Sequence, residues 1–246
     1  MKLPKMILFD YGDTLLCEPD RHFERGYATL LELATLNPNG CTVSDIEREV
    51  KRFFHDSMQL SRELYFDIGA QRCFRAMLEY LQIEIPLSLD EIESLVWTAA
   101  TPGAVMPCAD VMLDYLHAHG IRAGVISNTC WSESTLTERF NRLLPNAQME
   151  FIMASSEYLY RKPDPMIFEI ALRKARLAPD DVWFCGDRID WDVMGAANAG
   201  IFPVWYESDA AVREGVVDAS RELDTKIECL HIRHWNQLVE SLKTLE

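Results

Sequence analysis

The chain lacks the sequence features that are typical of membrane proteins, of repeat proteins and of domains joined by flexible linkers. Its uninterrupted apolar runs are about as long as a β-strand, far short of the roughly 20 residues that a membrane-spanning helix needs. The first residues, MKLPKMILFD, lead straight into a strand pattern without the apolar region of a signal peptide. Internal repeats, low-complexity segments and a Gly/Ser linker are also missing. We therefore expect a cytoplasmic protein that is not embedded in a membrane.

A surplus of basic residues is also lacking. The 246 residues include 39 acidic and 24 basic side chains, which gives a net charge of −15. Nucleic acids and anionic membrane surfaces are bound by clusters of Lys and Arg, so neither is an expected partner. A small phosphorylated molecule stays compatible with this charge, because one bound metal ion can reverse the local field. The sequence does not indicate an oligomeric state.

Spaced cysteine and histidine motifs are absent as well. The seven cysteines are scattered and no two of them form a C-x-x-C pair, whereas zinc sites and disulfide frameworks need closer spacing. The six histidines form neither an H-x-x-x-H nor an H-E-x-x-H pattern. Most of the cysteines are therefore expected to be small apolar residues in a reducing compartment.

What the chain does contain is an alternation of strands and helices. Short apolar runs of strand length cover residues 6–9, 121–127, 149–154, 182–185 and 201–205, and a further strand is predicted over 227–232. Helical patterns cover 110–119, 132–140, 166–175 and 191–199, and a closing helix is predicted over 234–245. This alternation predicts an α/β fold, with a Rossmann-like parallel sheet that carries helices on both faces.

Residues 17–100 break the alternation and are predicted to be entirely helical. The segments Ser44–Glu47 and Ser88–Glu91 have the pattern of capping boxes, and each opens a periodic apolar run. The segment TPGAVMPCAD, with two prolines and one glycine, marks the return of the chain. We predict an α/β core formed by residues 1–16 and 101–246, interrupted by an all-helical cap over 17–100.

Polar side chains follow several of the predicted strands, at the end of the sheet where open α/β folds bind ligands. If these strands are neighbours, one site collects Asp10, Ser127, Lys162, Asp187 and Asp192. Asp10 and Asp187 could share a Mg²⁺ ion, with Lys162 offsetting the repulsion between the carboxylates. Ser127 and Lys162 could hold phosphoryl oxygens, and Asp10 could attack phosphorus to form an aspartyl-phosphate.

Each of these residues also has an ordinary structural interpretation. Ser127 and Asn128 could form a turn or a helix N-cap, Lys162 could be a surface lysine, and Asp187 could be a turn residue. The order and spacing of the groups together favour a site. The segments in question are ILFDYGDTL at 7–15, GVISN at 124–128, RKPDPMIF around Lys162, and CGDRIDWDVMGAANAGI at 185–201.

These four motifs, in this order, resemble those of the haloacid dehalogenase-like hydrolase superfamily, and in particular its members with a helical cap inserted after the first motif. The resemblance implies that Asp10 is the nucleophile and that Ser127, Asn128 and Lys162 bind the phosphoryl group. It further implies a Mg²⁺ ion held by Asp10, the backbone carbonyl of Gly12 and Asp187, with Asp192 in support. The cap is expected to close over the site and select the substrate.

One position departs from the family pattern, in which phosphatases carry an aspartate two residues after the nucleophile as general acid and base. Here that position is Gly12, which can still offer its carbonyl to a metal but cannot transfer a proton. The neighbouring Asp13 is a candidate for the role if the turn bends suitably, and otherwise it caps the turn. A carboxylate of the cap or His22 could supply the proton instead. Loss of the acid/base costs about 10²–10⁴ in rate. The P-type ATPases of the superfamily, with threonine there, still form the aspartyl-phosphate.

The sequence therefore predicts an enzyme, a Mg²⁺-dependent phosphohydrolase of a small phosphorylated metabolite that works through an aspartyl-phosphate on Asp10. A 2-haloacid dehalogenase is an alternative. Asp187 and Asp192 together count against it, because those relatives need no metal and lack the Gly-Asp pair of the fourth motif. A phosphotransferase or mutase of the same fold is a further alternative. The last is a phosphate- or metal-binding protein with low turnover, which only Gly12 supports.

Overall fold

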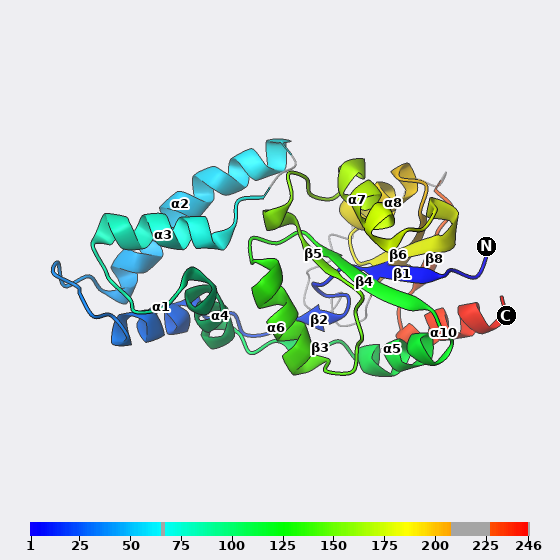
Figure 1. Cartoon of the computed structure of the whole chain (residues 1–246), viewed down its shortest axis with the longest axis horizontal. Coiled ribbons are helices and arrows are strands. Elements are labelled where there is room, and N and C mark those ends of the chain that lie inside the picture. The colour runs from blue at the N-terminus through cyan, green and yellow to red at the C-terminus, as the bar shows by residue number, and fades with distance from the viewer. Residues whose placement is uncertain (65–66, 208–226, 246) are drawn as a thin grey trace.

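A computed structural model of the chain describes residues 1–64, 67–207 and 227–245; over 55–64 it describes the backbone alone. Figure 1 shows an elongated molecule with a helical part at one end and a sheet flanked by helices at the other. Both termini lie at the sheet end. In the described residues no helix combines the length and the apolar character needed to cross a bilayer.

The centre of the larger part is a parallel sheet, as predicted. Its strands are β1 (Met6–Phe9), β4 (Arg122–Ser127), β5 (Ile152–Ala154), β6 (Val182–Gly186), β7 (Phe202–Tyr206) and β8 (Leu230–Ile232), in the spatial order β5-β4-β1-β6-β7-β8. Counted along the chain, this is the order 3-2-1-4-5-6 of the doubly wound dinucleotide-binding fold. The direction of winding reverses between β1 and β6, so the carboxyl ends of these two strands border the crevice where such folds bind ligands.

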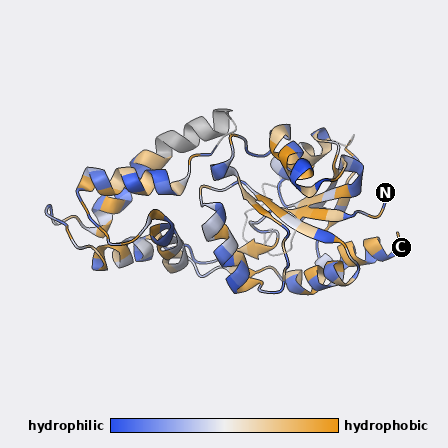
Figure 2. Ribbon diagram, viewed as in Figure 1, coloured by the Kyte–Doolittle hydropathy of each residue, from blue (hydrophilic) through white to orange (hydrophobic). Residues whose placement is uncertain are grey.

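Helices cover both faces of the sheet. Met6 and Leu8 pack towards α7 (Pro165–Ala175) and α8 (Met194–Asn198), whereas Ile7 and Phe9 face the opposite side. That side is covered by α5 (Ala109–Ala118), α6 (Glu133–Leu143) and α10 (Trp235–Lys243). Successive side chains of a strand point to opposite faces, so a strand covered on both faces is apolar throughout. Figure 2 accordingly shows the strands as mainly hydrophobic and the helices as mixed.

Short helical turns complete this part of the chain. They are η1 (Ser155–Glu157), η2 (Pro179–Asp181) and the π-helical turn η3 (Ile189–Val193), which runs directly into α8. The helix predicted over 191–199 therefore begins two residues earlier than expected and starts as a wider turn.

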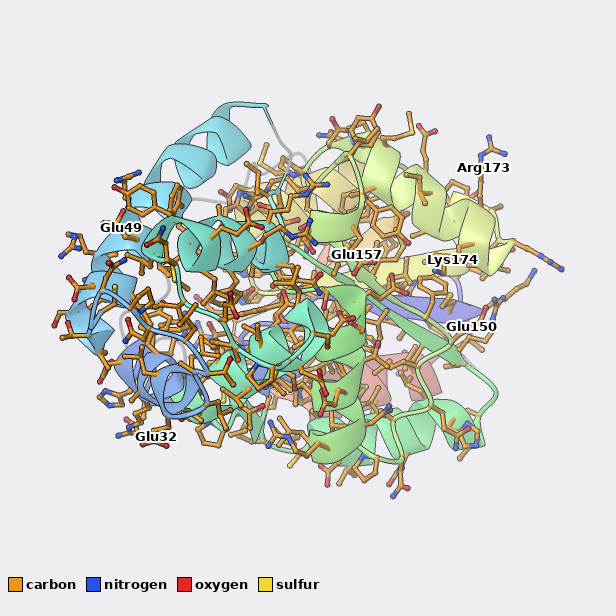
Figure 3. All side chains as sticks on the ribbon, turned by 60° about the vertical axis from the view of Figure 1, so that its left-hand side comes forward. Glu32, Glu49, Glu150, Glu157, Arg173 and Lys174 are labelled. Carbon is orange, nitrogen blue, oxygen red and sulfur yellow. The ribbon has the colours of Figure 1, made fainter. Side chains whose placement is uncertain are left out.

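The segment between β1 and the rest of the sheet is helical, as the pattern indicated. It contains α1 (Phe23–Glu32), α2 (Val43–Leu64), α3 (Ala70–Leu81) and α4 (Leu89–Ala100), which form the helical end of the molecule in Figure 1. We refer to these helices as the cap. Figure 3 shows Glu32 and Glu49 on the side of the cap away from the sheet. The division into a core of 1–16 and 101–246 and a cap of 17–100 stays a prediction.

The start of α4 has the predicted capping box. The Ser88 side chain accepts from the backbone N–H of Glu91, and the Glu91 carboxylate accepts from the backbone N–H of Ser88. The box predicted at Ser44–Glu47 is wrong, because α2 begins earlier, at Val43.

The two residues that cap α2 are Thr42 and Asp45. The Asp45 carboxylate accepts from the Thr42 backbone N–H at 2.8 Å, and the Thr42 hydroxyl accepts from the Asp45 N–H at 3.4 Å. The same reciprocal bonds therefore form two residues before the predicted place.

The two chain crossings between cap and core are joined by a small antiparallel sheet that the sequence did not predict. Its strands are β2 (Leu16–Cys17) and β3 (Ala104–Val105), with Leu16 opposite Val105. This sheet ties the turn after Asp10 to the segment through which the chain leaves the cap.

Candidate active site

Asp10 is the first residue after β1, at the carboxyl end of the sheet. Its backbone N–H donates to the carbonyl of Cys185 in β6 at 2.8 Å, so hydrogen bonding between β1 and β6 continues up to this residue. The Asp10 side chain is 13% exposed. The predicted nucleophile thus lies at the reversal point of the sheet, in a fixed and largely dry position.

The chain turns sharply after Asp10. The Tyr11 carbonyl accepts from the N–H groups of Leu15 and Leu16, and the Asp13 N–H donates to the Leu16 carbonyl at 2.8 Å. Asp13 has a φ of +54°, in the left-handed region, which aspartate tolerates better than most residues. Asp13 is therefore a turn residue, and its conformation places it on a tight loop beside the nucleophile.

Lys162 provides the central contact of the site. Its side chain is 1% exposed, and its Nζ lies 2.6 Å from Asp10 Oδ1 and 2.6 Å from Asp192 Oδ1. Burial by itself lowers the pKa of Lys162, but the two carboxylates outweigh it and hold the pKa above its ordinary value. The interpretation of Lys162 as a surface lysine is therefore wrong, because the residue is buried between two carboxylates.

The backbone of Lys162 is fixed from both sides. Asn128 Oδ1 accepts from the Lys162 N–H at 2.8 Å, and Asn128 Nδ2 donates to the Lys162 carbonyl at 2.7 Å. Both polar atoms of the Asn128 side chain are thus used to position the lysine. The phosphate contact predicted for Asn128 stays a prediction.

The helix that follows Lys162 has well-defined ends. Asp164 caps α7 by accepting from the Met166 N–H at 2.9 Å, and Pro165 occupies its first turn, where the missing N–H costs nothing. Arg173 and Lys174 lie in the last turn, and Figure 3 shows them at the far end of the helix from its start. A negative charge at the start of a helix and positive charges at its end interact favourably with the helix dipole. These charges therefore stabilise α7, the helix that follows the Lys162 loop.

Asp192 lies beneath Lys162 and is 1% exposed. Its Oδ1 accepts from Lys162 and its Oδ2 accepts from the Arg188 backbone N–H at 3.0 Å. A Cβ at position 186 would lie 2.3 Å from Asp192 Oδ2, so only glycine fits there. Burial raises the pKa of Asp192 above its usual value, while Lys162 opposes the rise. The role of Asp192 in supporting the metal stays a prediction.

Asp187 completes an acidic cluster. One carboxylate oxygen each of Asp10, Asp187 and Asp192 lies within 4.8 Å of the others. Burial, and then the charges of Asp10, Asp192 and Asp13, raise the pKa of Asp187 well above its usual value. Hard oxygen ligands in this number, with one lysine for several acids, fit a divalent cation such as Mg²⁺. The Trp205 indole N–H donates to the Asp187 carbonyl at 3.2 Å and holds this loop.

The other predicted residues border the cluster. Ser127 ends β4, the neighbour of β1, and is 3% exposed. Gly12 follows Asp10 closely: a Cβ built on it would have Asp10 Oδ2, at 4.0 Å, as its nearest atom outside the adjacent residues. Asp13 is near enough to Asp187 for its charge to raise the pKa of that carboxyl. The structure therefore brings Asp10, Lys162, Asp187 and Asp192 together, with Ser127, Gly12 and Asp13 at the edge.

A contact from the cap reaches the lysine loop, and the sequence did not indicate it. Asp67, just before α3, lies 2.9 Å from Arg161 Nη1, and the Ser155 hydroxyl donates to its other carboxylate oxygen. Arg161 directly precedes Lys162, and its guanidinium lies 5.0 Å from the centre of the Trp191 ring. The partners are far apart in the sequence, so only the fold could reveal this ion pair.

A second contact between cap and core is made by Glu93 of α4, which is fully buried. Its carboxylate accepts from the backbone N–H and hydroxyl of Ser132, from the Thr135 hydroxyl at 3.0 Å and from Gln71 Nε2 at 3.1 Å. Ser132 is the N-cap of α6, so Glu93 of the cap binds polar groups at the start of a helix that packs on the sheet. Burial raises the pKa of Glu93.

Comparison with known sequences gives relatives that are named as phosphatases. The chain is 26% identical over 217 residues to the glyceraldehyde 3-phosphate phosphatase of Methanothermobacter thermautotrophicus, a match that covers 85% of this chain and 88% of the relative. A shorter match, 36% identical over 72 residues, covers 29% of this chain and 28% of the phosphoserine phosphatase of Thermus thermophilus.

Solved structures of similar fold include proteins named as a haloacid dehalogenase and a HAD phosphatase. A 2-haloacid dehalogenase of Pseudomonas syringae pv. Tomato has a TM-score of 0.62 at 22% identity, covering 99% of this chain and all of that one. A HAD phosphatase of Thermococcus onnurineus has a TM-score of 0.58 at 17% identity, covering 98% of both chains. At these identities the likeness establishes the fold.

The family profile described as haloacid dehalogenase-like hydrolase matches residues 72–205, more than half of the chain. This range contains three of the four predicted motifs, and the remaining one brings Asp10 to the same site through β1. With the sheet order, the acidic cluster and the relatives in agreement, the chain belongs to the family of haloacid dehalogenase-like hydrolases.

Proposed function

We propose that the protein is a Mg²⁺-dependent phosphohydrolase of a small phosphorylated metabolite, with an aspartyl-phosphate on Asp10 as intermediate. The observation that carries the proposal is the position of Lys162 Nζ, 2.6 Å from the carboxylates of both Asp10 and Asp192. This buried ammonium group offsets negative charge beside the nucleophile, and it can stabilise further charge when a phosphoryl group arrives. A surface ion pair would have no such function.

The residues around Asp10 divide the work of phosphoryl transfer. An Asp10 oxygen attacks phosphorus, while Lys162 and the Ser127 end of β4 hold the phosphoryl oxygens in line. Asp192 keeps Lys162 in place, and Asn128 keeps its backbone in place. Asp10, Asp187 and the Gly12 carbonyl would hold the Mg²⁺ ion, with Asp192 in support; when bound, the ion neutralises charge on the transferred group.

The names of the relatives support a phosphorylated substrate over a haloacid. The relatives in question are phosphatases of glyceraldehyde 3-phosphate and of phosphoserine, both small phosphate monoesters. The dehalogenase of similar fold is only 22% identical, and it supports the fold without indicating the reaction. The acidic cluster of Asp10, Asp187 and Asp192 also favours a metal-dependent phosphatase.

The test is a hydrolysis assay on a panel of phosphorylated compounds and 2-haloacids, with and without Mg²⁺. We expect phosphate release that requires Mg²⁺ and that Asp10→Asn abolishes. Denaturing mass spectrometry of the rapidly quenched wild type should detect one added phosphoryl group, and a peptide containing Asp10 should carry it.

Asp181→Asn is the matched control for Asp10→Asn. Asp181 precedes β6 at the opposite end of the sheet and pairs with Lys2 and Lys5. We expect full activity in this variant. Release of halide without Mg²⁺ would support the dehalogenase alternative instead. Binding of Mg²⁺ and phosphate without turnover on any compound would support the binding-protein alternative. Transfer of the phosphoryl group to a second metabolite in place of water would support a phosphotransferase or mutase.

A further inference from the structure

Gly12 leaves an open side next to the nucleophile. A Cβ built on this residue would lie 4.0 Å from Asp10 Oδ2, and no other atom of the described residues beyond its two neighbours would be as near. The φ of Gly12 lies outside the left-handed region, so the backbone does not require glycine here. A Cβ at this position would therefore lie beside the reacting carboxylate at an ordinary contact distance.

The ionisable groups beside Asp10 already have other partners. Lys162 Nζ is bonded to Asp10 and Asp192 together. Asp192 is bonded to Lys162 and to the Arg188 backbone. Asp187 belongs to the proposed metal cluster, and Asp13 is held on a tight left-handed turn. Lys162, Asp187 and Asp192 do not occupy the open side at Gly12, because none of their atoms lies within 4 Å of a Cβ built there.

We propose that the enzyme acts on phosphate compounds whose leaving group departs without a proton: acyl phosphates, phosphoanhydrides and aryl or enol phosphates, in preference to alkyl phosphate monoesters. This inference rests on the proposed function. In the first step a bond forms between an Asp10 oxygen and phosphorus while the bond to the leaving oxygen breaks, and that oxygen takes both electrons. Carboxylates and phosphates carry this charge stably near neutral pH, and a phenolate, whose phenol has a pKa of about 10, is a much weaker base than an alkoxide, which must be protonated as it leaves.

The second step returns the enzyme to its starting state. Water attacks phosphorus, the bond from phosphorus to Asp10 breaks, and the carboxylate is restored. The proton of the attacking water passes to the released phosphate or to solvent. Without a base beside position 12 this step is slow, so the aspartyl-phosphate accumulates during turnover. A substrate with a good leaving group then gives a rapid burst of its leaving group before steady turnover.

The experiment measures kcat/KM, which reports formation of the aspartyl-phosphate, for substituted phenyl phosphates of increasing phenol pKa and for glycerol 2-phosphate. The wild type should lose activity steeply as the leaving group becomes more basic. Gly12→Asp, which places a carboxyl group on the open side, should flatten this dependence. In this variant the ratio of kcat/KM on glycerol 2-phosphate to kcat/KM on p-nitrophenyl phosphate should rise by about 10²–10⁴-fold, the usual value of general acid catalysis.

Gly12→Asn is the matched control, because it adds the same bulk without a carboxyl group, and its ratio of kcat/KM on glycerol 2-phosphate to kcat/KM on p-nitrophenyl phosphate should not rise. If kcat/KM of the wild type depended only weakly on the pKa of the leaving group, the inference would be overturned. If Asp13→Asn then made this dependence steep, Asp13 would be assigned as the proton donor. That measurement needs no variant at position 12 to fold. If no phosphate compound is hydrolysed with Mg²⁺, both the proposed function and this inference are wrong. If alkyl and aryl phosphates react equally well, only the inference is wrong.

Discussion

The side-chain amide of Asn128 binds both backbone polar groups of Lys162, accepting from its N–H at 2.8 Å and donating to its carbonyl at 2.7 Å. The two residues are 34 positions apart in the sequence. Through this pair of bonds the loop after β4 sets the position of the lysine that contacts Asp10. The polar residue next to Ser127 thus acts on the site through another residue.

Asn128→Ala should therefore lower activity by displacing Lys162. Loss of two partly buried hydrogen bonds is worth about 1–3 kcal/mol, which corresponds to roughly a 10- to 100-fold loss of kcat/KM if the lysine is misplaced. The measurement is steady-state kinetics at a temperature well below the melting transition of the variant.

The matched control is Asn37→Ala in the cap. Asn37 makes the same double contact, with the backbone N–H and carbonyl of Cys41, at 2.8 and 2.9 Å. This variant should lose a similar amount of stability and keep its kcat/KM. An equal loss of activity in both variants would contradict the positioning role of Asn128.

Lys162→Met should lower both stability and activity. Removal of one partner from a buried ion pair costs about 3–5 kcal/mol, because the Asp10 and Asp192 carboxylates lose their counter-charge. Adding Asp192→Asn removes one of the two uncompensated charges, so the double variant should unfold at a higher temperature than Lys162→Met alone. Its activity should stay lost. A double variant no more stable than the single one, in thermal unfolding followed by circular dichroism, would contradict this account.

Asp187→Asn should have opposite effects on stability with and without Mg²⁺. In the metal-free protein the Asp187 carboxyl lies close to those of Asp10 and Asp192, and its raised pKa reflects burial and this repulsion. The neutral amide should therefore raise the melting temperature when EDTA is present. Mg²⁺ at 100 times its Kd stabilises a binding protein by about 2.7 kcal/mol, and the variant should lose most of this gain.

Asp190→Asn is the control for that comparison. Asp190 lies in the same loop, but its carboxylate contacts Arg188 at 3.3 Å and is not in the acidic cluster. This variant should keep the stabilisation by Mg²⁺. If it lost the stabilisation as fully as Asp187→Asn, general loop charge would explain the Mg²⁺ effect and a direct ligand would not be needed.

The sheet was predictable because its strands are covered on both faces. Residues 6–9 were predicted as a strand and form β1 without change, and the order of the motifs placed Asp10 and Asp187 at the same edge. The first and last residues of a helix or strand were less predictable where contacts with residues distant in the sequence determine them. The turn η3 begins at Ile189, where Arg188 is bonded to Asp192, and Asp192 in turn is bonded to Lys162.

Contacts between cap and core also could not be predicted, because they join residues that are far apart in the sequence. The strands β2 and β3 contain two residues each, too few to give an alternating pattern, and they exist because Leu16 and Val105 meet. Glu93 fits a solvent-facing helix position in the sequence, yet its partner Ser132 is 39 residues away. A pattern within one helix cannot reveal the element that packs against it.

Glu93→Gln should weaken the contact between α4 and the start of α6. The carboxylate oxygens of Glu93 accept from Ser132, Thr135 and Gln71, whereas a glutamine offers one acceptor oxygen and places an NH₂ group against these donors. A buried donor left without its acceptor costs about 1–3 kcal/mol. We expect a lower free energy of unfolding in urea.

The effect of Glu93→Gln should shrink as the pH rises. Burial raises the pKa of Glu93 in the folded protein above its usual 4.5, so the folded state binds the proton more tightly than the unfolded state. Its contribution to stability is therefore complete below pH 4.5 and is lost as the pH rises through the raised pKa.

Glu91→Gln, in the first turn of the same helix, should show the opposite pH dependence, because backbone and side-chain bonds from Ser88 lower the pKa of Glu91. Its contribution is present above pH 4.5 and is lost as the pH falls through the lowered pKa. Urea unfolding of the three proteins between about pH 3 and pH 8 checks both signs. A Glu93→Gln effect that grows with pH would contradict the burial of an unfavourable charge at this interface.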